Sequence, residues 1–322
     1  MLRVAAIQAK MSVKDYRTPA DFKAKIFSLC ENALAGYSGE AILAFPEVIA
    51  LAVLFAKDYQ ELSSSKAKTV FLEILKRDWQ SLLKTAFRYK LGLKSIYYQN
   101  AITAYKVYTE TFAEAAKEFG AVIIAGSLFL PEIDEEATRG IHIKGKQVYN
   151  YSYSFSPSSQ IINRVGKVNL TRLEHKLRLN KASLSENYPF RVNKQKIAVA
   201  ICLDAFYDSV ITKYDALGTT IIVQPSANFA AWDRPWPQDT SLSEGEAWLK
   251  YGLCKQIQGR ENIVYGINPM LVGELFGMIV QGRSNIVANQ KYIANAKLEN
   301  INGLLAIAQS YDQEEIVLFD LD

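Results

Sequence analysis

Histidine and cysteine are both scarce in this sequence of 322 residues. The two histidines, His142 and His175, cannot build a three-histidine metal site, and neither stands in an obvious site context. The three cysteines, Cys30, Cys202 and Cys254, are odd in number and widely spaced, with no Cys-x-x-Cys pair. This pattern argues against a disulfide framework and indicates a reducing compartment. We therefore expect a cytoplasmic protein without a multi-histidine metal centre.

Long apolar runs and strong charge are also missing. The longest apolar run after the N-terminal segment, residues 48–56, is far shorter than the ~20 residues of a membrane-spanning helix. The first ten residues resemble a β-strand more than a signal peptide. The net charge of +4 is small for this length, whereas nucleic-acid-binding proteins show a concentrated basic patch. We expect neither stable membrane insertion nor a nucleic-acid partner.

Short β-branched or apolar runs alternate with helical stretches, and no linker or repeat interrupts them. Hydrophobic residues make up 49% of the chain and charged residues 22%, which is typical of a globular protein with a sizeable core. Strands are predicted at 3–9, 41–45, 121–127, 141–143, 160–165, 197–201, 220–224, 263–268, 284–287, 304–309 and 316–320, and helices at 19–35, 66–91, 95–119, 207–217 and 243–262. The pattern predicts a layered α/β fold over residues 1–322, in one domain with sheets inside and helices outside.

Residues 66–119 stand out as a long helical block, with Gly92 at a break that is typical of a helix end. The first half carries an apolar face and a cluster of lysines and arginines, and the second half carries an apolar and aromatic stripe. A basic amphipathic helix can lie on a membrane surface. Such stripes more often pack on the domain or on a second subunit, and we favour that interpretation.

Three predicted strands are each followed by a reactive side chain: Glu47, Lys167 and Cys202. A thiol is a strong nucleophile only as a thiolate, so a base must take its proton. Because histidine is scarce, a carboxylate is the available base, and partial burial of Glu47 would raise its pKa toward that task. Lys167 and the backbone N–H of Leu203 would stabilise the negative charge that develops on an attacked amide or nitrile.

Taken singly, each of these residues has a commoner structural role. A buried cysteine beside a strand is usually structural, a glutamate after proline often starts a helix, and a lysine after glycine is usually exposed. Their joint context is more specific. Phe-Pro-Glu at 45–47, Gly-Lys-Val-Asn-Leu at 166–170 and Ile-Cys-Leu-Asp at 201–204 occur in that order and resemble the three signatures of the nitrilase (carbon–nitrogen hydrolase) superfamily.

The resemblance covers nearly the whole chain. The segments that carry it are Val-Ala-Ala-Ile-Gln at 4–8, residues 112–127 before the lysine, Pro-Ser-Ala-Asn at 225–228, Arg-Glu-Asn at 260–262 and Gly-Arg-Ser-Asn-Ile at 282–286. It implies a four-layer αββα sandwich with an enlarged helical segment near 66–119, whose subunits pair into a homodimer or a higher homo-oligomer. It implies a triad of Glu47, Lys167 and Cys202. It also implies a second glutamate, for which Glu174 is the best match and Glu186 a weaker one.

The sequence departs from the family pattern around the expected substrate pocket. Asn169 stands where the lysine motif often has histidine, and the cysteine loop, Cys-Leu-Asp-Ala-Phe-Tyr-Asp at 202–208, is shorter than usual. The stretch from 47 to 120 is longer than the family leads us to expect. Aromatic and amide groups suit a pocket wall because they combine area with a polar handle. The residues predicted to contact substrate are Leu203, Phe206, Tyr207, Asn228 and Trp232.

The resulting prediction is a hydrolase that cleaves the C–N bond of a small amide or carbamoyl compound through a cysteine thioester, without a metal or organic cofactor. The Cys-x-Asp sequence resembles the amidase branches of the family, whereas nitrilases more often show Cys-Trp-Glu. Two alternatives stay open: a nitrilase that acts on a nitrile, and a non-catalytic binding protein on the same fold.

Overall fold

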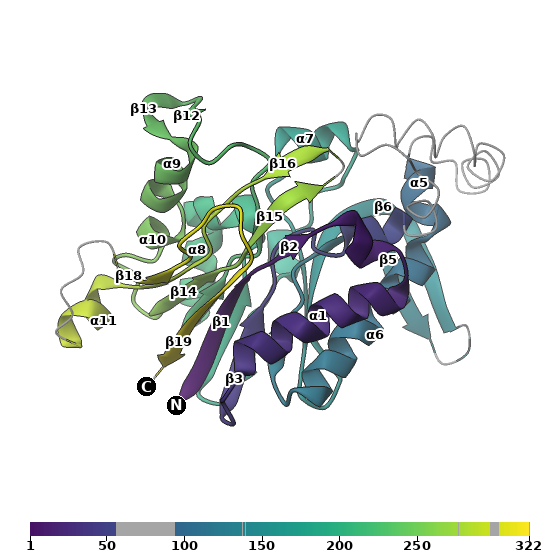
Figure 1. Ribbon diagram of the computed structural model, residues 1–322, viewed down its shortest axis with the longest axis horizontal. Coiled ribbons are helices and arrows are strands. Elements are labelled where there is room, and N and C mark those ends of the chain that lie inside the picture. The colour runs from purple at the N-terminus through teal and green to yellow at the C-terminus, as the bar shows by residue number, and fades with distance from the viewer. Residues whose placement is uncertain (56–93, 137, 139, 276, 297–302, 322) are drawn as a thin grey trace.

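The computed structural model describes residues 1–55, 94–136, 138, 140–275, 277–296 and 303–321. A first large sheet is formed mainly by strands from the N-terminal half of the chain (Figure 1). Its strand order is β19-β1-β3-β4-β6-β5, with β7 paired to β6. The strands are β1 (Leu2–Gln8), β3 (Glu40–Ala44), β4 (Val122–Ile124), β5 (Leu128–Glu136), β6 (Gly140–Phe155), β7 (Ile161–Gly166) and β19 (Glu315–Leu321). Because β1, β3 and β4 are parallel, the loops after β3 and β4 emerge at the same edge.

A second large sheet has the order β18-β17-β14-β10-β9-β8. Its strands are β8 (Phe190–Val192), β9 (Gln195–Val199), β10 (Ile221–Val223), β14 (Tyr265–Asn268), β17 (Asn285–Ala288) and β18 (Leu304–Ile307). The central strands β9, β10 and β14 are parallel and buried on both faces, which explains their continuous apolar sequences. Their carboxyl ends therefore also lie together.

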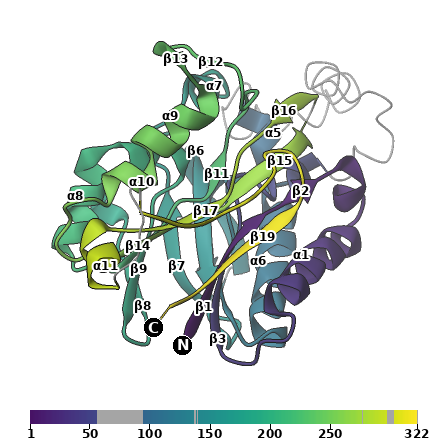
Figure 2. The ribbon, with the colours of Figure 1, turned by 60° about the vertical axis from the view of Figure 1, so that its left-hand side comes forward.

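Three groups of buried residues separate the layers. One lies between the first sheet and the helices α1 (Pro19–Leu34) and α6 (Ala101–Glu118), one between the two sheets, and one between the second sheet and the helices α8 (Asp208–Ala216) and α10 (Leu253–Gln256). Figure 2 shows the strands between α1 and α6 on one side and α8 and α10 on the other. The predicted α/β class and αββα sandwich are confirmed.

Smaller elements complete the described part of the chain. Two minor sheets contain β2 (Lys10–Met11), β11 (Ser226–Ala227), β15 (Met270–Leu275) and β16 (Met278–Val280), and β12 (Pro235–Trp236) with β13 (Asp239–Ser243). Short helices are α5 (Ser95–Gln99), α7 (Arg172–Lys176), α9 (Glu244–Tyr251) and α11 (Gln290–Asn295). Short 3₁₀ helices are Val13–Tyr16, Leu51–Phe55, Leu184–Glu186 and Cys202–Phe206.

Two predicted helices are each divided in the structure. The helix expected over 95–119 is broken at Asn100, whose side-chain amide donates to the carbonyl of Leu54 at 2.9 Å. The helix expected over 243–262 ends at Gly252, where a Cβ would lie 2.4 Å from the carbonyl oxygen of Trp248. A long-range contact therefore fixes the first break, whereas the second depends on the local backbone at Gly252. The helix predicted over 66–91 lies outside the described residues.

The loop that carries Glu47 is packed tightly against the loop after β4. Val48, directly after Glu47, has a φ of 53°, which a β-branched residue rarely adopts, and its N–H donates to Ser127 Oγ at 2.9 Å. Gly126 has a φ of +66°, and a Cβ there would lie 2.0 Å from the carbonyl oxygen of Pro46. Only glycine therefore lets these two loops approach.

We expect the substitution Gly126→Ala to lower the free energy of unfolding by about 2–5 kcal/mol, because it adds a backbone clash to an unfavourable φ. Gly120→Ala is the matched control: Gly120 also has a positive φ, +60°, but nothing lies within 4 Å of its Cβ position. The free energy of unfolding of that control should fall by only about 1–2 kcal/mol. Denaturant unfolding of both variants measures the difference, and equal losses would contradict the proposed clash with Pro46.

Candidate active site

Glu47 is the centre of a buried hydrogen-bond network, and its side chain exposes only 5% of its surface. One carboxylate oxygen, Oε1, accepts hydrogen bonds from Lys167 Nζ at 2.7 Å and from Asn150 Nδ2 at 2.9 Å. The other oxygen accepts from the backbone N–H of Ala227 at 3.2 Å. Together with burial, the charge of this carboxylate raises the pKa of the nearby Cys202 thiol. Glu47 therefore binds an ammonium and lies close to a thiol.

Lys167, directly after β7, lies between two carboxylates. Its Nζ is 2.7 Å from Glu47 and 2.9 Å from Glu174. A capping box at the start of α7 fixes Glu174, because its carboxylate accepts from Thr171 N at 2.8 Å and from Thr171 Oγ1 at 3.0 Å. Glu186, the weaker candidate for the second glutamate, is exposed. The structure thus brings Glu174 rather than Glu186 to the lysine.

Cys202 follows β9 and begins the 3₁₀ helix Cys202–Phe206 with a φ of 49°. A non-glycine residue in this left-handed region costs on the order of 1–3 kcal/mol. The residues that follow β10 hold its peptide on both sides: its N–H donates to the carbonyl of Pro225 at 2.8 Å, and its carbonyl accepts from Gln224 Nε2 at 2.9 Å. Adjacent parallel strand ends therefore fix the direction of the thiol, in a residue that is 4% exposed.

Two carboxylates and one ammonium leave one net negative charge in this enclosed space. Burial raises the pKa of Glu47, although Lys167 opposes the shift. Burial lowers the pKa of Lys167, but the negative groups around it outweigh burial and raise that pKa overall. Burial and the charge of Glu47 raise the pKa of Cys202 well above its usual range. The thiol is therefore protonated at rest, beside a carboxylate whose basicity is increased.

Asp204 ties the cysteine turn to the loop that follows Lys167. Its carboxylate accepts from Val168 N at 3.0 Å, Asn169 N at 2.6 Å and Asn169 Nδ2 at 3.0 Å. Burial raises the pKa of Asp204 to about 6. Asn169, which replaces the family's frequent histidine, thus contributes to the same link. Asp204 helps to fix the spacing between Cys202 and Lys167.

The residues predicted to contact substrate lie on two segments that flank these groups: Leu203, Phe206 and Tyr207 in and after the 3₁₀ helix, and Asn228 and Trp232 after β11. The ring of Phe206 packs edge-on against Trp248, with centroids 5.0 Å apart, while Tyr207 is exposed. Asn228 follows Ala227, the donor to Glu47, and Asn228 and Trp232 both hydrogen-bond to Gln281. A pocket formed by these side chains stays a prediction.

Sequence reasoning missed Asn150 and the link that Asp204 makes. The alternation Asn-Tyr-Ser-Tyr-Ser-Phe at 150–155 indicates a strand with one polar face, and Thr-Arg-Leu-Glu at 171–174 has the capping-box pattern. Both signals identify local structure. Neither shows that the polar face of β6 meets Glu47, because that contact joins residues 103 positions apart.

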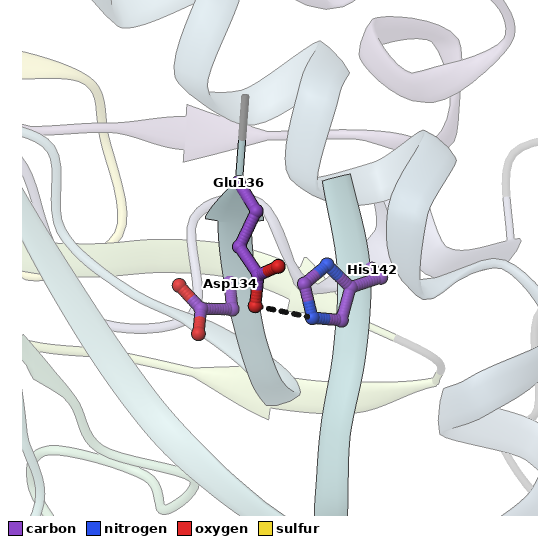
Figure 3. A group of neighbouring side chains, drawn as sticks. All are labelled: Asp134, Glu136 and His142. Carbon is purple, nitrogen blue, oxygen red and sulfur yellow. Dashed lines mark ion pairs between the residues drawn. The ribbon is translucent and has the colours of Figure 1, made fainter. Parts of the chain in front are cut away.

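One group of described side chains has the composition of a metal site: Asp134, Glu136 and His142, whose ligand atoms lie within 4.8 Å of one another on the β5–β6 hairpin (Figure 3). Its own ion pairs account for the grouping, since His142 lies 3.6 Å from Glu136 and Lys144 lies 4.0 Å from Asp134. The group is also separated from Asn150 by roughly 25 Å of β6. We assign no ion to it.

Residues 3–246 match the carbon–nitrogen hydrolase family. The chain therefore belongs to this family and is an enzyme of the carbon–nitrogen hydrolase class, as its resemblance to the nitrilase superfamily predicted. No curated protein matches the chain significantly.

Solved structures show the same fold at low sequence identity. A mutant of the amidase from Nesterenkonia sp. AN1, with acrylamide added at its active-site cysteine, has a TM-score of 0.61 and 13% identity, over 100% of this chain and 94% of that one. A carbon–nitrogen hydrolase from Helicobacter pylori G27 has a TM-score of 0.63 and 15% identity, over 98% of this chain and 87% of that one. Among the described helices, none has the length and apolar composition that a membrane crossing requires.

Proposed function

We propose that this carbon–nitrogen hydrolase cleaves a small amide or N-carbamoyl compound with Cys202 as nucleophile, Glu47 as general base and Lys167 as electrostatic stabiliser, within a single domain. The observation that carries the proposal is the buried position of Glu47, which accepts a hydrogen bond from the Lys167 ammonium at 2.7 Å and lies close to the Cys202 thiol. The Nesterenkonia protein supports the proposal because it is an amidase with a reactive cysteine in its active site.

The reaction begins when Glu47 takes the proton of Cys202 while the sulfur attacks the carbonyl carbon. This transfer moves a proton within the site and leaves its net charge unchanged. Lys167 and the N–H of Leu203 stabilise the oxyanion that forms. Glu47 then returns the proton to the leaving ammonia or amine, and a thioester remains on Cys202. A water that Glu47 deprotonates hydrolyses the thioester and restores the thiol.

Glu174 takes part as a fixed negative charge that holds the ammonium. The capping box and the ammonium bind its carboxylate, and although burial acts to raise the pKa of Glu174, Lys167 and Thr171 leave that pKa lowered. Glu47 is the carboxylate with the raised pKa. The two glutamates are thus assigned different roles by their surroundings: Glu47 moves the proton and Glu174 stays ionised.

The test of this proposal is turnover of three substrate groups by the full chain: short aliphatic amides, N-carbamoyl compounds and nitriles. We expect ammonia release from the first or second group. Turnover of nitriles alone would refute the amide preference and support the nitrilase alternative. Binding without turnover in any group would support the non-catalytic alternative. The homo-oligomeric state and the cytoplasmic location stay predictions.

The pKa of Asp204 gives this activity a specific pH dependence. A carboxyl group with a folded pKa near 6, above its ordinary value, loses its charge as the pH falls through 6, and it then holds the loop after Lys167 less firmly. Because the pKa of Asp204 is higher in the folded state than in the unfolded state, its protonation does not lower the free energy of unfolding. Activity should therefore fall with pH, while Asp204 itself causes no loss of stability.

In the parent enzyme both Asp204 and Glu47 take up a proton as the pH falls, whereas in the Asp204→Asn variant only Glu47 does so. We therefore expect kcat/KM to fall more steeply on the acid side in the parent than in the variant. Asp208→Asn is the control, because Asp208 is an exposed carboxylate at the start of α8. Its acid limb should match that of the parent. An identical slope in all three proteins would show that Asp204 does not titrate in the working range.

A further inference from the structure

The side chain of Asn150 bridges the two glutamates of the site. Its Nδ2 donates to Glu47 Oε1 at 2.9 Å and to Glu174 Oε1 at 3.0 Å. Lys167 Nζ approaches the same two carboxylates from its own side, at 2.7 and 2.9 Å. The four residues therefore close a ring in which two carboxylates alternate with one charged donor and one neutral donor.

The backbone of Asn150 is fixed on both sides within the first sheet. It pairs with Phe129 of β5, and its carbonyl accepts from the N–H of Lys167 at 2.9 Å. Side chains alternate along β6, so Tyr151 and Tyr153 pack into the helix-facing core while Asn150 points the opposite way and is fully buried. One residue thus positions the lysine through its backbone and both glutamates through its side chain.

The amide group is oriented by the two carboxylates. If its oxygen faced them, it would meet two acceptors and donate nothing, so the NH₂ group must point to the glutamates. Among the described residues, the Asn150 Oδ1 that results from this orientation has no hydrogen-bond partner. A buried oxygen without a partner is unfavourable for stability, and such local conflicts concentrate at functional sites.

We propose that Asn150 is a positioning residue, whose neutral donor holds Glu47 toward Cys202 and keeps that carboxylate ionised without adding charge to the site. This inference rests on the proposed function of the Glu47–Lys167–Cys202 group. The charged and titratable groups that face Glu47 are Lys167, Glu174 and Cys202. A second lysine in place of Asn150 would cancel the net negative charge, and a carboxylate would double it.

The substitution Asn150→Leu keeps a similar size and removes the donor. We expect kcat to fall about 10- to 100-fold, as for the loss of a hydrogen bond to a charged group. KM should change much less, since the amide holds the base and does not hold the substrate. The acid limb should move to higher pH by about one unit, because losing a donor to the charged form raises the pKa of the carboxylate.

Two further variants keep the test informative if the leucine variant folds poorly. Serine in place of Asn150 is smaller and retains one donor. The acid limb of the pH profile of Asn150→Ser should therefore lie between those of the parent and the leucine variant. Asn150→Asp replaces the donor with a third carboxyl group and should shift the limb furthest. The matched control is Ser152→Ala. Ser152 lies two residues further along the same face of β6, is also fully buried, and has a hydroxyl oxygen without a hydrogen-bond partner among the residues that the structure describes.

The rate of Cys202 alkylation by iodoacetamide, measured against pH, tests the inference without a substrate. Its acid limb should shift in the Asn150 variants and stay in place in Ser152→Ala. This result would hold even if no amide were turned over, so failure of the proposed function is distinguishable from failure of the inference. A folded Asn150→Leu enzyme with an unchanged limb and a kcat within about threefold of the parent would overturn the positioning role.

Discussion

Replacing Cys202 with alanine is expected to lower kcat by at least about 10⁴-fold, because removing a covalent nucleophile leaves only the weak catalysis of binding and charge stabilisation. The fold should survive the change. Alanine has the same Cβ as cysteine, so the strained φ of 49° and the backbone hydrogen bonds to Pro225 and Gln224 are retained. Denaturant unfolding should therefore show a loss of less than about 2 kcal/mol.

The other two cysteines supply the controls. Cys30 and Cys254 are both buried, and burial raises the pKa of each thiol, that of Cys254 to about 11. Within the described part of the chain, no carboxylate contributes to the raised pKa of either thiol, so Cys30→Ala and Cys254→Ala should keep nearly full activity. Intact-mass analysis after iodoacetamide should show one adduct, which disappears in Cys202→Ala. An adduct on Cys30 or Cys254 with Cys202 unmodified would defeat the assignment of the nucleophile.

The sequence was sufficient to predict the layered α/β class and the elements whose patterns are local. The buried parallel strands β1, β3, β9 and β10 were predicted to within about two residues, since continuous apolar runs bounded by turns are characteristic of them. The hairpin of β5 and β6 was largely missed. Its outer part is rich in charge, as in Pro-Glu-Ile-Asp-Glu-Glu at 131–136, and cross-strand pairing rather than an apolar pattern defines it.

The site shows the same division between local and distant information. Glu47, Lys167 and Cys202 each follow a strand, where functional groups often lie, and the order of their motifs resembles the family, so their convergence could be predicted from that resemblance. Asn150 could not be found in this way, because it lies within a strand and its role depends on the side that the first sheet turns toward the second. A single sequence records the polar residue but not the residue that it faces.

The second large effect is expected from Lys167→Met. In the parent enzyme the ammonium lies within 2.9 Å of two buried carboxylates. Without it, Glu47 and Glu174 share one enclosed space with no cation, so one of them must take up a proton or the fold must open. Breaking a buried ion pair by removing one partner costs about 3–5 kcal/mol. Activity should fall by at least about 10²- to 10³-fold, because the oxyanion also loses its charged donor.

A second substitution separates the two consequences. Adding Glu174→Gln to Lys167→Met removes one of the stranded negative charges, so the double variant should regain part of the lost stability but none of the lost activity. Lys213→Met is the control for losing a partly buried lysine, because Lys213 Nζ donates to backbone carbonyls of Leu184 and Asn187 instead of carboxylates. Its kcat should stay close to that of the parent. If the double variant recovered activity together with stability, Lys167 would be a structural counter-ion, and the charge that develops on the substrate would have to be stabilised by the backbone N–H of Leu203 alone.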